Sequence, residues 1–332
     1  MPRINVFITV DTEHSIGGAF GDRHLKPVGN EKRVWGKIGV KSFGIPLMMD
    51  IAESYDIRLT FFVEVLNKYY FGEDETKKVC EYILNRGHDI QLHLHPNYLN
   101  FLTENPQEQK FSDIIGTYTL KRQIELLDDG IKTLVRNGIP RPIAFRAGCF
   151  GANQDTLRAL RENGFLVDSS YNRAYLPAPC LLEDNGINDL AYLDGIWELP
   201  VTNFVESTKL RSKRFKPFDI NGVSFPEMKW VLNRAKENGP RSVTIILHSF
   251  SFLKPYDVQY NKVRPRRYVI QRFEKLCQYL RENVDMFEVR TFASLDKENL
   301  MQMSQQGVHV FRRVPPLFSL ARGFQQLRGK LF

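Results

Sequence analysis

The sequence predicts an α/β protein built on a parallel sheet, which is either open or closed into a barrel. Short apolar and β-branched segments, typical of buried strands, alternate with segments whose apolar residues recur at helical spacing. The connections between these strands are long enough for parallel crossovers. Polar side chains gather where the predicted strands end, which is where α/β proteins collect their functional groups.

The predicted strands and helices alternate along most of the chain. The expected strands are residues 4–10, 58–65, 88–95, 143–146, 165–168, 196–202, 242–250 and 287–290. The expected helices are residues 45–55, 74–86, 119–137, 154–163 and 268–282. Asn153 is the expected cap of the fourth helix and Gly164 its end. Residues 17–41 are rich in glycine and charge and have little periodicity, so they predict a long loop over the strand ends.

Composition limits the class of protein. A chain of 332 residues, 42% of them hydrophobic, can bury one large α/β core or two smaller ones and is not globally disordered. The net charge is +8. The four cysteines are far apart and form no CxxC pair, which favours reduced thiols and a cytoplasmic protein. We find no signal peptide and no apolar run of the ~20 residues that span a bilayer.

The segment GHDIQLHLHPNY, residues 87–98, places two histidines at the end of a predicted strand. His93 and His95 are two residues apart, so on a strand both imidazoles lie on one face. Pro96 cannot continue a central strand, so the pair sits where the next loop begins. Two imidazoles are two of the ligands of a Zn²⁺ site that needs a carboxylate from elsewhere in the chain. The alternative is a pair of solvated loop histidines.

Other polar residues follow the remaining strands, and together they form a chemically complete set. The set is Asp11, Glu13, His93, His95, Arg146, Asp168 and His248. Taken singly, each has an ordinary explanation as a turn, ion-pair or core residue. Two imidazoles and one carboxylate leave an open position on a catalytic metal. A second carboxylate can accept a proton, an arginine can keep it ionised, and a distant histidine can protonate a leaving group. No nucleophile elbow, P-loop or dinucleotide fingerprint occurs in a suitable context.

The order of these motifs resembles the polysaccharide deacetylase family, the NodB-homology carbohydrate esterases. ITVDTE (8–13) resembles the family's TFDD motif, and YDIRLTFFV (55–63) is similar to its ATFFV segment. GHDIQLHLHP (87–96) resembles GHEIGNHTxxHP, AFRAGCFGAN (144–153) resembles RxPxG, and TIILHS (244–249) resembles the closing LxH motif. The similarity runs from about residue 4 to residue 295.

The resemblance implies a distorted parallel (β/α) barrel and a divalent metal, usually Zn²⁺. By position it makes Asp11 the general base, Arg146 its partner, His248 the general acid, and Asp168 the carboxylate that tunes His248. Thr12 stands where the family has a second aspartate ligand, so we expect Glu13 to replace it.

The family's second metal histidine corresponds to Asn97, and we expect the nearer His95 to serve instead. The expected ligands are therefore Glu13, His93 and His95, with Asn97 as the alternative to His95. These departures suggest a divergent branch, similar to the cytoplasmic enzymes of surface-polysaccharide and lipopolysaccharide biosynthesis.

The expected activity is metal-dependent removal of an acetyl group, above all an N-acetyl group, from a sugar, a nucleotide-sugar or a lipid-linked sugar. A catalytically inactive carbohydrate-binding protein on the same fold is the alternative, and metal content separates the two. The basic runs KLRSKRFK (209–216) and KVRPRRY (262–268) lack a nucleic-acid-binding motif, so we expect no nucleic acid partner. Such runs are solvated surface or hold the phosphates of a substrate.

We expect a catalytic domain over residues 1–298 and a basic tail over residues 299–332. No acidic residue follows Glu298, while the basic residues of the tail include Arg312, Arg313 and Arg322. One interpretation is a weak peripheral contact with an anionic membrane. The other is a terminal helix packed on the barrel. The oligomeric state is not indicated by the sequence.

Overall fold

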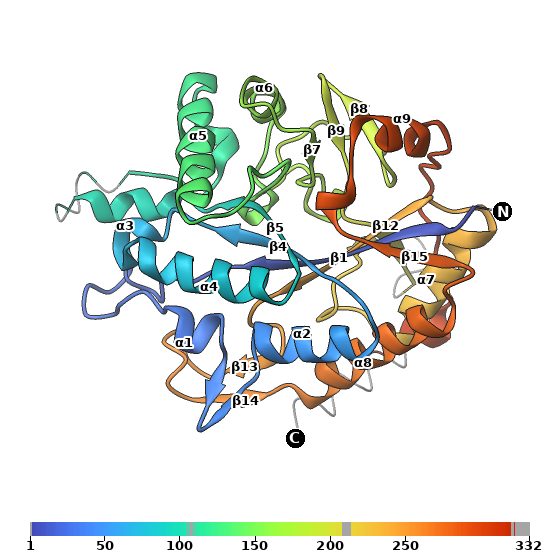
Figure 1. Cartoon of the computed structure of the whole chain (residues 1–332), viewed down its shortest axis with the longest axis horizontal. Helices are drawn as coiled ribbons and strands as arrows, with labels where there is room; N and C mark the ends of the chain where they lie inside the picture. The colour runs from blue at the N-terminus through green and yellow to red at the C-terminus, as the bar shows by residue number, and fades with distance from the viewer. Residues whose placement is uncertain are drawn as a thin grey trace.

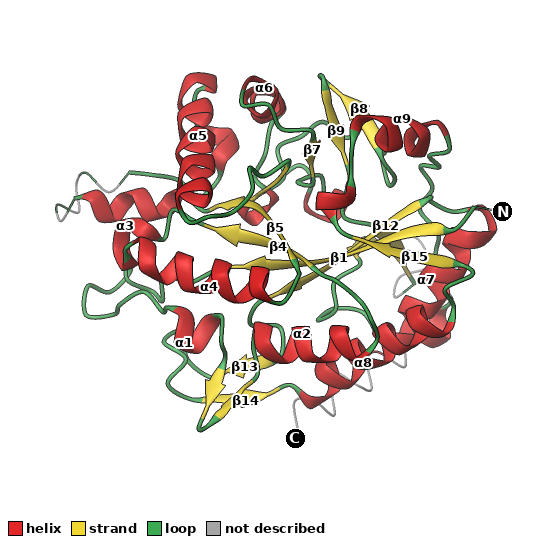
Figure 2. Cartoon of the chain, in the orientation of Figure 1, coloured by secondary structure: helices red, strands yellow, loops and turns green. Residues whose placement is uncertain are grey.

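The computed structural model describes residues 2–103, 105, 108, 110–207, 214–319 and 322. Within them, nine strands form a sheet in the middle of the molecule, and helices cover its outer side (Figures 1 and 2). The order is β12 (Ser242–His248), β1 (Ile4–Thr12), β4 (Thr60–Glu64), β5 (Asp89–Leu94), β6 (Ala144–Ala147), β7 (Val167–Asp168), β9 (Ile196–Glu198) and β8 (Ala191–Leu193). A ninth strand, β15 (Phe287–Arg290), also pairs with β1.

All pairings in this sheet are parallel except that of β8 with β9. Beyond β9 the chain turns back toward the opposite edge of the sheet. There Thr202 N donates to Thr244 O of β12 at 3.2 Å, and Asp219 forms an isolated bridge with Ile246. The sheet is therefore curled into a barrel whose last side is irregular, which confirms the predicted distorted parallel (β/α) barrel.

Strand β1 is the centre of this arrangement. Along one edge it pairs with β12, from Asn5 opposite Ser242 to Asp11 opposite His248. Its other edge is shared, because β15 pairs with its first half and β4 with its second half. The carboxyl ends of β1, β4, β5, β6 and β12 consequently meet at one rim of the barrel.

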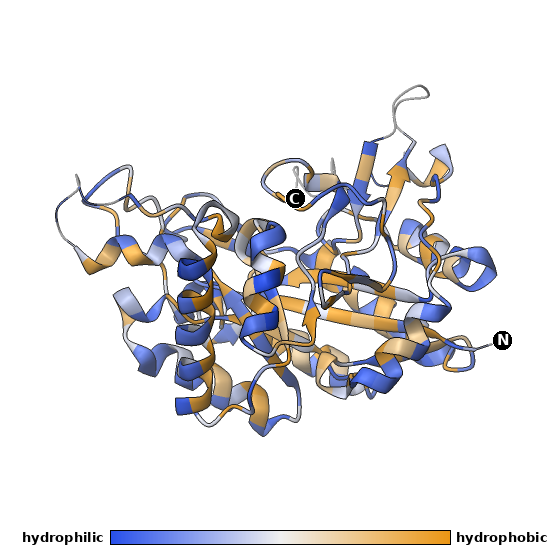
Figure 3. Ribbon diagram, turned by 90° about the horizontal axis from the view of Figure 1, so that it is seen from above, coloured by the Kyte–Doolittle hydropathy of each residue, from blue (hydrophilic) through white to orange (hydrophobic). Residues whose placement is uncertain are grey.

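Every predicted helix is present. They are α2 (Ile45–Ser54), α4 (Glu73–Asn85), α5 (Leu120–Arg136), α6 (Gln154–Glu162) and α8 (Arg267–Glu282). The Asn153 side chain accepts from Thr156 N at 2.9 Å, and Gly164 has a φ of +73°, so α6 begins and ends as predicted. The named helices of the described residues also include some that were not predicted, which are α1 (Asn30–Arg33), α3 (Lys68–Phe71), α7 (Phe225–Asn238) and α9 (Lys297–Gln305). Figure 3 shows hydrophobic strands in the middle and hydrophilic outer faces on the surrounding helices.

Short hairpins and 3-10 turns decorate the barrel. The hairpins are β2 (Lys37–Ile38) with β3 (Lys41–Ser42), β10 (Asn203–Glu206) with β11 (Arg214–Pro217), and β13 (Leu253–Pro255) with β14 (Val263–Pro265). The 3-10 turns are η1 (Pro96–Leu102), η2 (Ile115–Thr117), η3 (Gly148–Phe150), η4 (Arg173–Tyr175) and η5 (Phe292–Ser294). The segment predicted as a long loop holds α1 and β2. Most of the basic run 209–216 lies outside the described residues.

The first part of the predicted basic tail packs on the barrel. Val205 N of β10 donates to Arg312 O at 2.9 Å, and Val314 N donates to Val205 O at 3.0 Å. Residues 320, 321 and 323–332, on which the predicted membrane contact depends, lie outside the described residues. Among the helices that the structure does describe, none has the length and apolar character needed to cross a bilayer.

Candidate active site

The structure gathers most of the predicted site residues at the rim formed by the strand ends. Asp11 lies opposite His248 in the β1–β12 pairing. His93 lies between Glu64 and Arg146 in the pairings of β5 with β4 and β6. In-register residues of parallel strands point to the same side of a sheet, so pairing alone brings side chains from distant segments together.

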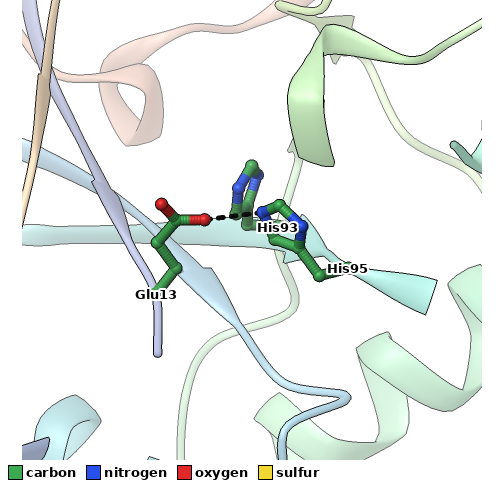
Figure 4. Close-up of side chains that lie close together, drawn as sticks. All are labelled: Glu13, His93 and His95. Carbon is green, nitrogen blue, oxygen red and sulfur yellow. Dashed lines mark ion pairs between the residues drawn. The ribbon is translucent and has the colours of Figure 1, made fainter. Parts of the chain in front are cut away.

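Glu13, His93 and His95 form a compact cluster just beyond these strand ends (Figure 4). One ligand atom from each lies within 4.8 Å of the other two. Glu13 Oε2 is 2.6 Å from His95 Nε2, and the two imidazole rings are 4.9 Å apart at an interplanar angle of 77°. The structure thus brings together the three residues expected to bind a metal.

The His93 ring is held by a hydrogen bond on the side away from the cluster. Its Nδ1 lies 2.7 Å from Arg146 O, a carbonyl that can only accept, so Nδ1 carries the proton. Burial lowers the pKa of His93 to about 4, which makes the ring neutral at pH 7. A neutral imidazole protonated at Nδ1 presents the Nε2 lone pair, the form that binds a metal.

His95 is oriented in the same way by a different group. Its Nδ1 lies 3.0 Å from both carboxylate oxygens of Asp113. Burial disfavours the charged ring, but Asp113 and Glu13 outweigh it and raise the pKa of His95 well above its ordinary value. Despite its own burial, Glu13 has a pKa below its ordinary value because of His95 and Arg33. Without another cation, a protonated His95 therefore balances two partly buried carboxylates.

These residues fit a divalent cation. Both histidines use Nδ1 for an acceptor behind them and direct Nε2 toward the Glu13 carboxylate, as metal-binding histidines do. Although His95 Nε2 is close to Glu13, it makes no hydrogen bond of acceptable geometry among the described residues. Asn97, the alternative ligand, accepts a hydrogen bond from Asn100 and makes none to the three cluster residues among the described residues. Two nitrogens and one carboxylate suit Zn²⁺ with an open position.

Asp11 and Arg146 form a buried ion pair beside the cluster. Arg146 Nη1 donates to Asp11 Oδ1 at 2.6 Å and to Thr9 Oγ1 at 2.8 Å. The same guanidinium donates to Ser169 O and Oγ, and it lies 4.2 Å from the centroid of the Phe62 ring. Arg146 is fully buried and crosses the barrel interior from β6 to β1. Its contacts fix the position of Asp11.

His248 lies at the end of β12, on the other side of Asp11, and its acidic neighbour is not the predicted one. Asp168 is buried against Ser170 Oγ at 2.6 Å and against the Glu198 carboxyl. Burial raises the pKa of Asp219, and among the neighbouring charges His248 opposes this most strongly. Among the described residues Asp168 makes no hydrogen bond or ion pair with His248, so the expectation that Asp168 tunes His248 is not supported. Register explains the difference, because Asp168 lies opposite Glu198 in the pairing of β7 with β9.

The residues that position the cluster were not predicted from the sequence. Arg33 Nη2 lies 3.2 Å from Glu13 Oε1, and its guanidinium stacks 3.3 Å from the Phe250 ring centroid. Arg33 ends the four-residue helix α1, and Asp113 and Asp219 lie outside helices and strands, so no periodicity points to any of them. Gly148 could have been recognised from the sequence, since it lies in the AFRAGCFGAN motif. A Cβ there would lie 2.5 Å from Leu94 O and 2.8 Å from His95 Nδ1.

A parallel barrel with a metal-type cluster at its rim defines the class: the chain has the fold of the polysaccharide deacetylases. A protein from Mycobacterium smegmatis that has been assigned as a polysaccharide deacetylase superposes on this chain with a TM-score of 0.52 at 18% identity. The match covers 91% of this chain and 90% of that one. The predicted resemblance is thereby confirmed for the fold. No family model and no curated protein matches the chain.

The same fold also occurs in a protein that is named for a different activity. A 4-alpha-glucanotransferase from Thermococcus litoralis has a TM-score of 0.52 at 10% identity, and the match covers 91% of this chain but only 40% of that one. A peptidoglycan N-acetylglucosamine deacetylase is also similar, with a TM-score of 0.45 at 15% identity, covering 88% and 87% of the two chains. Fold does not decide function, so the activity has to be argued from the side chains.

Proposed function

We propose that this protein is a metal-dependent hydrolase that removes an acetyl group, in the first place an N-acetyl group, from a sugar or polysaccharide precursor. The observation that carries the proposal is the cluster of Glu13, His93 and His95 with the Asp11–Arg146 ion pair beside it. Three metal ligands next to a separately held carboxylate are what a hydrolytic metal site requires.

Glu13, His93 and His95 would hold the cation, Zn²⁺ or another divalent ion. When bound, such a cation polarises the acetyl carbonyl and lowers the pKa of a water in the site. Thr12 cannot replace an aspartate ligand, but Glu13 supplies a carboxylate to the same cluster. Arg33 fixes Glu13 Oε1, which leaves Oε2 directed at the histidines.

The remaining residues divide the proton transfers between them. Asp11 accepts a proton from the attacking water, and Arg146 holds Asp11 in the orientation needed to do so. An amine is a poor leaving group, so its nitrogen has to be protonated as the C–N bond breaks. His248, opposite Asp11 in the pairing of β12 with β1, would donate that proton.

We place this reaction in the cytoplasm, on a precursor of a surface polysaccharide such as lipopolysaccharide. The support is chemical: all four cysteines are free, three of them buried, which suits a reducing compartment. The substrate would then be a free sugar, a nucleotide-sugar or a lipid-linked sugar.

The test is acetate release by metal-loaded protein from N-acetylated sugars, nucleotide-sugars and lipid-linked sugars. Asp11→Asn should keep its metal and lose about 100-fold or more in turnover, because the general base is gone. Asp285→Asn, which changes an exposed aspartate, is the matched control and should match wild type. Full activity of Asp11→Asn would exclude Asp11 as the base. Sugar binding without acetate release from any substrate would favour the inactive carbohydrate-binding alternative.

A further inference from the structure

A cavity of about 470 Å³ lies apart from the residues of the catalytic cluster. Its lining includes Arg173 and Tyr175 from η4, Arg214, Phe215 and Lys216 from β11, and Asp219. This volume is within the usual range for a small-ligand site. The function proposed above assigns no role to its basic and aromatic side chains.

Two side chains connect the cavity to the catalytic residues. Asp219 interacts electrostatically with His248 and Asp11 at the rim and with Lys216 in the cavity. Tyr175 stacks on Phe150, with ring centroids 5.4 Å apart at an angle of 14°. Phe150 belongs to the turn that follows Arg146 on β6. A sugar bound at the rim would therefore extend into this cavity on the side of His248.

The cavity has a surplus of positive charge. Its lining holds three basic residues and two acidic ones, and one of the acidic residues, Glu206, is already contacted by Arg322. The Arg173 guanidinium is paired with Asp184 at 3.0 Å, 4.4 Å from the Phe215 ring centroid. Lys216 and Arg214 thus share Glu206 with Arg322, and Lys216 is in addition attracted by Asp219.

Neither of these two cations has a full partner within the described part of the chain. Lys216 Nζ is 4.0 Å from Glu206 Oε1, beyond hydrogen-bond reach, although the Lys216 side chain is only 20% exposed. Arg214 is 78% exposed and lies 3.7 Å from Glu206 Oε2. Keeping an ammonium largely out of water without a hydrogen bond is unfavourable, and burial lowers the pKa of Lys216. A bound anion would relieve that cost.

We propose that this cavity binds a phosphoryl group on the substrate, with Lys216 and Arg214 as its ligands and Tyr175 beside the sugar ring. The inference rests on the proposed function and narrows its substrate to a phosphorylated acetylated sugar. Lysine and arginine both bind phosphate oxygens through charge-assisted hydrogen bonds. The phosphoryl group could belong to a sugar phosphate or to a diphosphate linkage, and the two sources can be separated by experiment.

The test is calorimetric titration of the metal-loaded full chain with N-acetylglucosamine 1-phosphate and with neutral N-acetylglucosamine. Lys216→Gln should weaken binding of the phosphorylated sugar about tenfold or more, since a charge-assisted contact is lost, and leave binding of the neutral sugar unchanged. Arg214→Gln, at a largely exposed side chain, should act in the same direction without affecting the fold. Lys275→Gln, at an exposed lysine of α8, is the matched control.

Equal affinity of wild type, Lys216→Gln and Arg214→Gln for the phosphorylated sugar would overturn the inference. UDP-N-acetylglucosamine binding more tightly than the sugar phosphate would point to a diphosphate, and equal binding would point to a single phosphoryl group. Phosphate-dependent binding without acetate release would uphold this site and reject the hydrolase. Acetate release that depends neither on phosphorylation of the sugar nor on Lys216 would uphold the hydrolase and reject this phosphoryl site.

Discussion

Both histidines of the candidate metal site are oriented by an acceptor behind the ring. For His93 this acceptor is the Arg146 carbonyl, and for His95 it is the Asp113 carboxylate. Such partners fix the tautomer and the direction of the free nitrogen. The arrangement also joins the two halves of the site, because Arg146 holds His93 through its backbone and Asp11 through its side chain.

The first prediction concerns the identity of the ligands. His93→Ala should lose the bound divalent ion, because two ligands and an open site bind a metal weakly. Asn97→Ala should keep it. The measurement is the metal content per chain of each variant, determined by mass spectrometry after dialysis. Loss of metal in Asn97→Ala together with retention in His95→Ala would reverse the choice between these two residues.

The second prediction concerns the space that Gly148 leaves for the His95 ring. Gly148→Ala places a methyl group against Leu94 O and the imidazole, so the ring has to move. We expect metal affinity to fall about 10- to 100-fold, as it does when the groups that orient a metal-binding histidine are disturbed. Chelator competition measures the affinity, and a thermal melt reports on the fold. In Gly21→Ala, the matched control, the new Cβ meets its nearest atom at 3.6 Å, so wild-type affinity is expected.

At the scale of elements, the pairing of β7 with β9 creates a buried carboxyl pair. Asp168 and Glu198 are opposite each other, and Asp168 Oδ2 and Glu198 Oε2 have no hydrogen-bond donor among the described residues. Burial raises the pKa of both groups, and the repulsion of Asp168 adds to the effect on Glu198. The physical solution is one proton shared between the two carboxyl groups.

The third prediction tests this shared proton. The folded state keeps a proton that the unfolded chain releases above the ordinary glutamate pKa of 4.5, so the free energy of unfolding falls as pH rises past that value. Glu198→Gln should remove the part of this pH dependence that comes from the carboxyl pair. That part lowers the free energy of unfolding by at most about 1.4 kcal/mol per pH unit. Urea unfolding from pH 5 to pH 9 measures it. Glu183→Gln, at an exposed glutamate, should keep the wild-type slope, and an unchanged slope in Glu198→Gln would contradict a shared proton.

Element by element, prediction from sequence succeeded where periodicity was strong and failed where it was interrupted. The strands and long helices of the barrel follow period-two or period-3.6 patterns and were found. Helix α7 was not predicted, although Ser224 and Glu227 form a capping box and Pro226 suits a first turn. Asp168 was misplaced for another reason. Its partner depends on which strand lies beside β7, and pairing between distant strands cannot be read from local pattern.

At the scale of the whole molecule, Arg322 ties the end of the described chain to the barrel. Its guanidinium donates to Glu227 Oε1 of α7 at 2.8 Å and contacts Glu206 of β10, and all three residues are buried. Removing one residue of a buried ion pair destabilises the folded protein, because the remaining residue is left charged and desolvated.

The fourth prediction follows from this contact. Arg322→Ala should lower the free energy of unfolding by about 3 kcal/mol, since Glu206 and Glu227 lose a buried cation. Denaturant unfolding measures the change. Arg267→Ala, at an exposed arginine of α8, should change it by less than about 0.5 kcal/mol. Equal stability of both variants would show that Arg322 does not hold this position in solution.

The candidate site residues were largely predictable and their supporting residues were not. Each member of the predicted set lies in the last part of a strand or just after it, and a parallel barrel brings such residues to one rim; these are Asp11, Glu13, His93, His95, Arg146 and His248. Arg33, Asp113 and Asp219 reach the same site from a short helix and from loops. Their positions depend on how loops pack over the barrel, which no local pattern reports.

The pairing of β1 has a consequence for how the protein is made. β1 is synthesised first, yet it pairs with β12 and β15, which are among the last strands to be synthesised. At translation rates of about 5–20 residues per second, an apolar strand waits on the order of 10–50 s for its neighbour. During that time the nascent chain exposes unpaired backbone that could join another chain. We therefore expect a chain whose synthesis stops before β12 to need a chaperone that covers the free edge of β1.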